Sequence, residues 1–289
     1  MPLSAPPPAG ARALPADTFK GQTVAITGGG TGLGKGIALE FARCGANVAI
    51  LSRKPEHLQA GVDAVSALGA QAAAVSCDVR EPDRIAAAFD EIEAKLGPVS
   101  VLINNAAGNF PIPADEMSPN GWRTVVDIVL NGTFYCSREF AKRRLAAKQG
   151  GAILNIGATY SWTGGPGTAH SAAAKAGVTN MTMSLAVEWA PDDIRVNCLA
   201  PGRFPHTDLP EHMTRHQVGS NADMSVPGQR VGELRELGWA ATFLCSPYAA
   251  YITGHTLVVD GGNWLRRSLT MPDFTPIRDQ FGGRRKDDA

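Results

Sequence analysis

Short apolar runs alternate with longer amphipathic stretches from about residue 22 onward. Short apolar runs bounded by turn residues are typical of buried strands. Seven such runs are present: Thr23–Thr27, Asn47–Leu51, Gln71–Ser76, Val99–Ile103, Gly151–Ile156, Arg195–Leu199 and Thr256–Val259. Because a strand that is covered on both faces is apolar along its whole length, these runs predict a parallel sheet of seven strands.

Amphipathic stretches lie between the apolar runs, and several begin with proline or follow a turn residue, as helix starts prefer. The expected helices are Leu33–Cys44, Pro55–Leu68, Pro82–Leu96, Gly121–Ala147, Ala172–Trp189 and Gly232–Leu244. Strands that alternate with helices along one chain predict the α/β class. We expect a single Rossmann-type, doubly wound domain with helices on both faces of its sheet.

Three segments depart from this alternation. Residues 1–19 are rich in proline and alanine and predict a flexible arm that either packs in an extended form or stays disordered. The folded domain is expected to cover residues 20–265, with a lid at about 203–230 where no hydrophobic period is sustained. A loop of that length is either a functional lid or disordered. Residues 266–289 are expected to form a tail with a charged end.

Composition narrows the classes of function. The 27 Lys and Arg residues balance 27 Asp and Glu residues, so no net charge favours nucleic acid or an anionic membrane as a partner. The five cysteines are scattered, which predicts free thiols in a reducing compartment. No apolar run approaches the roughly 20 residues that span a bilayer. Since the ends also lack recognisable targeting signals, we expect a cytoplasmic protein.

The segment from Thr27 to Gly34 leaves an expected strand and opens an expected helix. Its glycines permit positive φ and a close approach to a pyrophosphate, and the helix start directs N–H groups and a positive dipole end toward it. We therefore expect a dinucleotide here, bound by Gly28, Gly30, Thr31, Gly32 and Leu33. An ordinary glycine-rich turn is the alternative.

Charge after the second expected strand bears on the choice of dinucleotide. A site for a ribose 2′-hydroxyl uses an acid about 20 residues after the glycine turn, whereas Arg53 and Lys54 occupy that place. Two cations stabilise a 2′-phosphate, so we expect NADPH, the alternative being that both only solvate a helix start. Asp78 either accepts from the adenine amino group or caps the helix at Pro82.

Motifs in the same order along the chain resemble the short-chain dehydrogenase/reductase family. They are the glycine turn, Asn104-Asn105-Ala106-Ala107-Gly108, Asn131, Lys175 and Pro201-Gly202, within a match from about Lys20 to Gly262. The resemblance implies that Asn105 and Ala106 lie beside the adenosine half of the cofactor and that Lys175 holds the nicotinamide ribose. It also implies that Pro201 and Gly202 pass the carboxamide. We expect from it a homotetramer.

Two positions depart from the common pattern of that family. The tyrosine usually found four positions before the lysine is Ser171, and the usual serine is Ala158. The nearest tyrosine to Lys175 is Tyr160. Ketone reductases of the family use their tyrosine to protonate the oxygen on the carbon that receives hydride. This chain cannot do so with a tyrosine at that position.

A conjugated thioester gives the displaced tyrosine a purpose. If hydride adds to the far end of a 2,4-diene, negative charge develops on the thioester oxygen, several ångströms from the carbon attacked. Preorganised donors to such an oxygen contribute about 3 kcal/mol each in a water-poor site. Tyr160 and Asn109 are the candidate donors. As alternatives, Tyr160 only caps its loop and Asn109 only shapes its turn.

This arrangement resembles the 2,4-dienoyl-CoA reductases of the short-chain family. The resemblance is carried by Asp17–Gly21, Thr27–Gly36, Ser52–Lys54, Cys77–Arg80, Asn104–Phe110, Asp127–Thr133 and the set Tyr160, Ser171 and Lys175. It implies that Tyr160 and Asn109 bind the thioester oxygen, and that Ser171 and Lys175 position NADPH. It further implies that Arg80 and Phe110 contact the acyl-CoA substrate, and that the product is a trans-3-enoyl-CoA of fatty acid β-oxidation.

Some alternatives remain open. Arg203 or Arg215 in the lid either meets a CoA phosphate or is solvated. His212 and His216 share a helical face, but no third ligand has suitable spacing, so no metal is expected. Two rival functions are another short-chain reductase of an enoyl-CoA or carbonyl compound, and a non-catalytic NADPH-binding protein.

Overall fold

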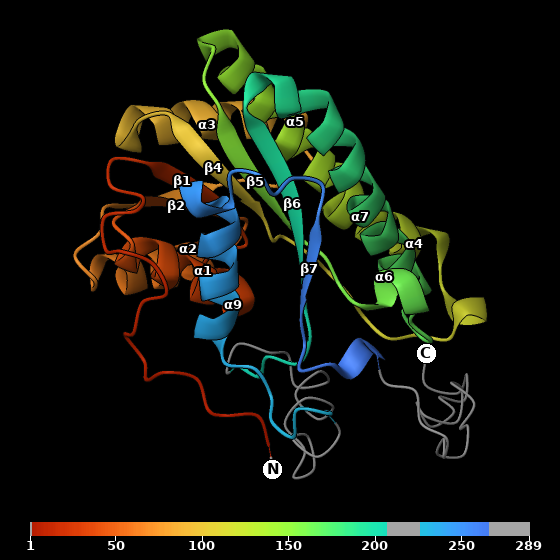
Figure 1. Cartoon of the computed structure of the whole chain (residues 1–289). Helices are drawn as coiled ribbons and strands as arrows, with labels where there is room; N and C mark the ends of the chain where they lie inside the picture. Colours follow the sequence, from red (N-terminus) through yellow and green to blue (C-terminus); the bar gives the residue numbers. More distant parts are fainter. Residues whose placement is uncertain (1, 207–225, 266–289) are drawn as a thin grey trace.

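A sheet of seven parallel strands forms the centre of the computed structural model, which describes residues 2–206 and 226–265 (Figure 1). The strands are β1 (Thr23–Thr27), β2 (Asn47–Ser52), β3 (Ala72–Ser76), β4 (Val99–Asn104), β5 (Gly151–Ile156), β6 (Ile194–Pro201) and β7 (Thr256–Val259). Their order is β3-β2-β1-β4-β5-β6-β7, and each neighbouring pair is parallel. The expected doubly wound sheet is confirmed, with its switch point between β1 and β4, where such sheets bind ligands.

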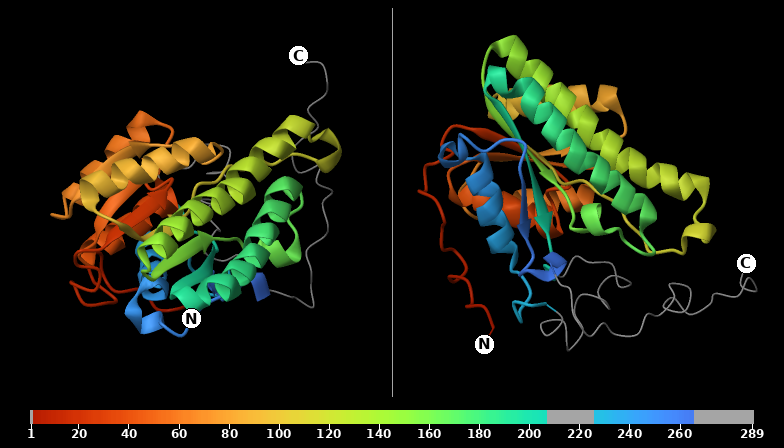
Figure 2. Two further views of the ribbon diagram at one scale, coloured as in Figure 1. Left: turned by 90° about the horizontal axis from the view of Figure 1, so that it is seen from above. Right: turned by 45° about the vertical axis from the view of Figure 1, so that its right-hand side comes forward.

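Helices cover both faces of the sheet (Figure 2). They are α1 (Gly32–Arg43), α2 (Pro55–Ser66), α3 (Pro82–Leu96), α4 (Pro119–Val126), α5 (Gly132–Ala147), α6 (Tyr160–Thr163), α7 (Ala169–Trp189) and α9 (Leu234–Cys245). Short 3₁₀ turns lie at Ala114–Glu116, Ala190–Asp192, Pro247–Ala249 and Asn263–Leu265. One apolar core joins α1, α2 and α9 to the sheet, and a second joins α3, α5 and α7 to it.

Alternation along each strand supplies both cores. In β1, Ile26 packs with Phe41 of α1, whereas the neighbouring Ala25 belongs to the core that contains Phe89 of α3. All four side chains are fully buried. Burying a phenylalanine side chain contributes about 1.5–3 kcal/mol, so these cores hold the strand ends rigidly in place.

The helix expected over Gly121–Ala147 is divided, which corrects the prediction. Between α4 and α5, Asp127–Asn131 forms a π-helical segment. Apolar positions continue through this wider turn, so the periodicity of the sequence does not reveal it. Such segments occur frequently at functional sites, and Asn131 lies in this one, where its side-chain amide donates to Asp127 Oδ1 at 2.8 Å.

The amino-terminal arm runs beside α9 (Figure 1). Arg235 Nε donates to the carbonyl of Pro7 at 2.8 Å, and Trp239 Nε1 donates to the carbonyl of Ala11 at 3.2 Å. Proline has no backbone N–H, and the arm is held to α9 through its carbonyl groups. Two predicted segments lie outside the described residues: residues 207–225 of the expected lid and the tail from residue 266. The first of them contains His212, Arg215 and His216.

Within the described residues, no helix has the length and apolar character needed to cross a membrane.

Candidate active site

The glycine turn joins β1 to α1 at the carboxyl end of the sheet. Gly28 has a φ of 64° and Gly32 a φ of 50°, a region that residues with a side chain rarely adopt. A Cβ atom on Gly30 would overlap the carbonyl oxygen of His57 in α2. Thr31 is the N-cap residue, and its side chain does not cap the helix. The turn thus requires glycine and leaves a helix start of the kind that binds a pyrophosphate.

A second turn, directly after β4, supports the glycine turn. Asn105 Nδ2 donates to the carbonyl of Thr27 at 3.0 Å and to that of Gly28 at 3.1 Å. The N–H of Ala106 donates to Thr27 Oγ1 at 2.9 Å. These bonds join the two turns into one unit at the switch point.

The candidate residues for the adenosine half lie after β2 and β3. Arg80 Nε donates to both carboxylate oxygens of Asp78, at 3.0 and 3.1 Å, and Arg53 Nη1 lies 3.7 Å from Asp78 Oδ2. The hydrogen bonds from Arg80 hold the pKa of Asp78 below its usual value. The backbone N–H that Asp78 caps is that of Arg80, before α3 begins, so the helix-capping interpretation is not supported. Lys54 follows Arg53 at the start of α2.

Tyr160 and Ser171 meet at the other side of the switch point. The Tyr160 hydroxyl lies 3.1 Å from Ser171 Oγ. Ser171 and Lys175 lie one turn apart on α7, and therefore on the same helix face; both are buried. Lys175 Nζ donates to the carbonyl of Ile156 at the end of β5. The Tyr160 hydroxyl thus contacts Ser171, which occupies the position where the family commonly has its tyrosine. Ser171 lies one helical turn before the retained lysine, Lys175.

Burial shifts the pKa values of both Lys175 and Tyr160. It lowers the pKa of Lys175 to about 8, against the opposing effect of Cys198. It raises the pKa of Tyr160, against the opposing effect of the Ser171 hydrogen bond. The phenol is therefore protonated at neutral pH and able to donate, while the Lys175 ammonium is still charged.

Asn109 and Phe110 lie on the loop between β4 and α4. The N–H of Ile112 donates to the carbonyl of Gly167 at 2.8 Å, which joins this loop to the segment that precedes α7. Phe110 packs edge-on against His170, with ring centroids 4.6 Å apart. The Oδ1 atom of Asn109 is buried without a hydrogen-bond partner. The structure thus places both residues near the amino-terminal end of α7, which carries Ser171.

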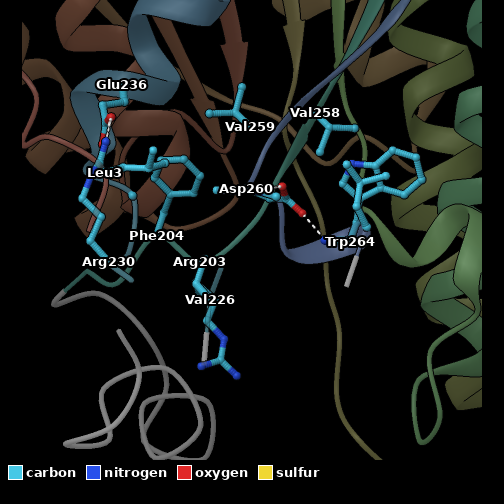
Figure 3. A pocket seen from close by; sticks show the side chains of 14 residues that line it. Leu3, Arg203, Phe204, Val226, Arg230, Glu236, Val258, Val259, Asp260 and Trp264 are labelled. Carbon is cyan, nitrogen blue, oxygen red and sulfur yellow. Dashed lines mark hydrogen bonds and ion pairs between the residues drawn. The ribbon is translucent and has the colours of Figure 1, made fainter. Parts of the chain in front are cut away.

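A cavity of about 380 Å³ lies at the carboxyl ends of β6 and β7 (Figure 3). β6 ends at Pro201, and the N–H of Gly202 donates to the carbonyl of Val259 at 2.9 Å. Arg203 and Trp264 both line the cavity. A ring contact links it to α6, because the ring centroids of Trp264 and Trp162 lie 5.6 Å apart.

Three residues near these sites were not singled out from the sequence. The ring of His206 lies against the glycine turn, where a Cβ atom on Gly32 would come within 2.6 Å of His206 Cε1. His170 and Ser161 are the chain neighbours of Ser171 and Tyr160, and the ring nitrogens of His170 and the Oγ of Ser161 are buried without a hydrogen-bond partner. In the sequence, His170 and Ser161 could have been found only as the chain neighbours of Ser171 and Tyr160. In the described part of the chain, no group of three His, Cys, Asp or Glu residues could hold a metal ion.

Known proteins are similar to this chain in sequence and fold. A family model described as Enoyl-(Acyl carrier protein) reductase matches residues 28–263. The chain belongs to the short-chain dehydrogenase/reductase family. A crystal structure of a short-chain dehydrogenase from Bacillus anthracis is 44% identical, with a TM-score of 0.78 over 86% of this chain and 98% of that one. As a member of this family the protein is an oxidoreductase, and the family fold implies a nicotinamide cofactor.

Two curated relatives within the short-chain dehydrogenase/reductase family carry more specific names. One is a probable 2,4-dienoyl-CoA reductase of Bacillus subtilis, named for producing (2E)-enoyl-CoA; it is 42% identical over 84% of this chain and 97% of its own length. The other is a peroxisomal 2,4-dienoyl-CoA reductase of Rattus norvegicus, named for producing (3E)-enoyl-CoA; it is 41% identical over 89% of this chain and 87% of its own length.

Proposed function

We propose that this protein reduces a 2,4-dienoyl-CoA to a trans-3-enoyl-CoA with NADPH. The observation that carries the proposal is the contact between Tyr160 and Ser171, whose side-chain oxygens lie 3.1 Å apart. The Tyr160 phenol enters this site from a backbone position other than the one at which the family commonly has its tyrosine. It is therefore suited to donate to a substrate oxygen, such as a thioester oxygen, that is remote from the carbon attacked by hydride. The names of the relatives from Bacillus subtilis and Rattus norvegicus support the same substrate class.

The residues present fit a bound NADPH. The glycine turn offers a pyrophosphate site at the start of α1, and Lys175 and Ser171 are the residues that would hold the nicotinamide ribose. Arg53 and Lys54 would bind the 2′-phosphate, because both carry positive charge at the end of β2. When bound, the nicotinamide supplies the hydride that the substrate accepts.

Side chains of the protein then stabilise the negative charge that forms on the substrate. Hydride addition at Cδ places negative charge on the thioester oxygen, where the Tyr160 hydroxyl and Asn109 Nδ2 donate hydrogen bonds. Burial supports the role of Tyr160, because it raises the pKa of the phenol and keeps its proton in place. A water molecule protonates the resulting dienolate at Cα, which gives the 3-enoyl product.

Contacts to the rest of the substrate are assigned to Phe110, Arg203 and Arg80. Arg80 must exchange or share its bonds to Asp78 in order to reach a CoA phosphate, because its guanidinium contacts both carboxylate oxygens. We place the reaction in the β-oxidation of unsaturated fatty acids. A cytoplasmic location and a homotetrameric assembly complete the proposal.

A substrate panel tests this function. The absorbance of reduced nicotinamide is followed with 2,4-hexadienoyl-CoA, a 2-enoyl-CoA and a 3-ketoacyl-CoA as alternative substrates. We expect fast loss with the dienoyl-CoA and little with the others. Faster turnover of the ketone would contradict the proposal, and so would thermal stabilisation by NADPH with no substrate consumed, since binding alone raises Tm.

A further inference from the structure

Several buried polar groups without hydrogen-bond partners gather around the amino-terminal end of α7. They are Asn109 Oδ1 on the loop after β4, Ser161 Oγ on α6, and both ring nitrogens of His170 on α7. The large majority of buried side-chain polar atoms in proteins have a hydrogen-bond partner. Ser161 and His170 are the chain neighbours of Tyr160 and Ser171, and Asn109 precedes Phe110, whose ring packs on His170. Unpaired groups this close to the Tyr160–Ser171 contact point to partners that form when substrate binds.

His170 is the most constrained of these residues. Its side chain is 0% exposed, and its ring packs edge-on against Phe110 at an interplanar angle of 62°. Phe110 also lies close to α4, since a Cβ atom on Gly121 would lie 3.0 Å from Phe110 Cζ. The imidazole is therefore held between α7 and the loop that carries Asn109.

The surroundings of His170 favour a neutral imidazole. Burial lowers the pKa of His170, so that the ring carries no charge at neutral pH. A neutral imidazole has one N–H donor and one acceptor nitrogen. The Thr168 backbone interacts with the ring and opposes this lowering of the pKa, but neither ring nitrogen makes a hydrogen bond of full geometry within the described residues.

Asn109 needs a donor of this kind if it binds the thioester oxygen. The two ends of a side-chain amide are nearly equal in shape, so its orientation depends on what bonds to Oδ1. An amide turned the wrong way would present oxygen to the developing oxyanion and repel it. Asn109 precedes Phe110, against which the His170 ring packs, and Asn109 Oδ1 is buried and unpaired.

We propose that His170 is a positioning residue for Asn109. When acyl-CoA binds, the ring N–H of His170 donates to Asn109 Oδ1 and holds the amide with Nδ2 facing the thioester oxygen. His170 acts through Asn109 and does not touch the substrate. This inference rests on the proposed function, because it assigns the orientation of a group that stabilises the dienolate.

A double-mutant cycle tests the coupling, with kcat and KM for 2,4-hexadienoyl-CoA measured for His170→Phe, Asn109→Ala and the double variant. Phenylalanine keeps a ring against Phe110 and removes both nitrogens. We expect His170→Phe to lower kcat about 10-fold in the wild type and less than about 2-fold in the Asn109→Ala background, since coupled residues are not additive. His170→Gln, which retains an N–H donor, is expected to recover most of the loss.

The controls separate a folding defect from a positioning defect. The dissociation constant for NADPH and Tm are expected to be unchanged in His170→Phe, and His170→Leu provides a second variant without a donor. His255→Phe makes the same chemical change at an exposed position and is expected to leave kcat unchanged. Equal losses in both backgrounds, or no loss, would overturn the positioning role. A wild-type chain that does not reduce 2,4-hexadienoyl-CoA would overturn the proposed function before any variant is made.

Discussion

The Tyr160 hydroxyl lies 3.1 Å from the hydroxyl of Ser171, although the two residues belong to different helices, α6 and α7. Ser171 stands where members of the family commonly carry a tyrosine. The phenol therefore reaches the site from another backbone position, and under the proposed function its oxygen would serve a reacting group displaced from the carbon that accepts hydride. This relationship connects the departure from the family pattern to a conjugated thioester substrate.

Replacing Tyr160 with phenylalanine removes the donor and keeps the ring. We expect kcat for 2,4-hexadienoyl-CoA to fall about 10²-fold or more, because one preorganised donor to an oxyanion has an effect of that order. The dissociation constant for NADPH should stay the same. Steady-state kinetics and a fluorescence titration measure the two quantities, and an unchanged kcat would remove Tyr160 from the mechanism.

A tyrosine at position 171 is not expected to repair this loss. In the double variant Tyr160→Phe with Ser171→Tyr, the new phenol would serve an oxygen on the carbon attacked, whereas the dienoyl substrate needs a donor at the thioester. We expect kcat for the dienoyl-CoA to remain at the level of Tyr160→Phe. A kcat within about 10-fold of the wild type would mean that the activation free energy differs by no more than about 1.4 kcal/mol. Such a recovery would show that the position of the phenol is not decisive.

The sheet could be predicted because each of its strands is an apolar run between turn residues. The predicted bounds of β1, β5 and β7 agree with the structure. The contact between Tyr160 and Ser171 could not be predicted, because it depends on α6, a single helical turn in a segment whose glycines indicate a loop. The pairing of Phe110 with His170 joins segments far apart in sequence. No local pattern encodes such a contact.

The charge after β2 predicts a preference for NADPH. Arg53→Ala combined with Lys54→Ala is expected to weaken NADPH binding about 10-fold or more, because charge-assisted hydrogen bonds to a phosphate are lost. NADH binding should change little, since it has no 2′-phosphate. Isothermal titration of both cofactors measures this. Lys142→Ala, at an exposed site on α5, is the control, and equal weakening of both cofactors would argue against a 2′-phosphate site.

Lys175 makes stability depend on pH in a defined direction. Its pKa falls from 10.5 to about 8 on burial, so between these values the unfolded chain holds a proton that the folded chain has lost. The free energy of unfolding should therefore rise with pH from about 8 to 10.5, and the cost of the buried charge is fully present below about 8. Relative to Lys175→Met, the wild type should gain stability over this range in urea unfolding. A constant difference would contradict the shift.

The position of the added hydride and of the remaining double bond tests the central claim most directly. 2,4-Hexadienoyl-CoA is reduced with NADPH that carries deuterium at C4 of the nicotinamide, and the product is examined by NMR. The account predicts deuterium at Cδ and a trans double bond between Cβ and Cγ, since charge accumulates on an oxygen held by Tyr160 and the proton adds at Cα. Deuterium at Cβ, or a product whose double bond lies between Cα and Cβ, would contradict it.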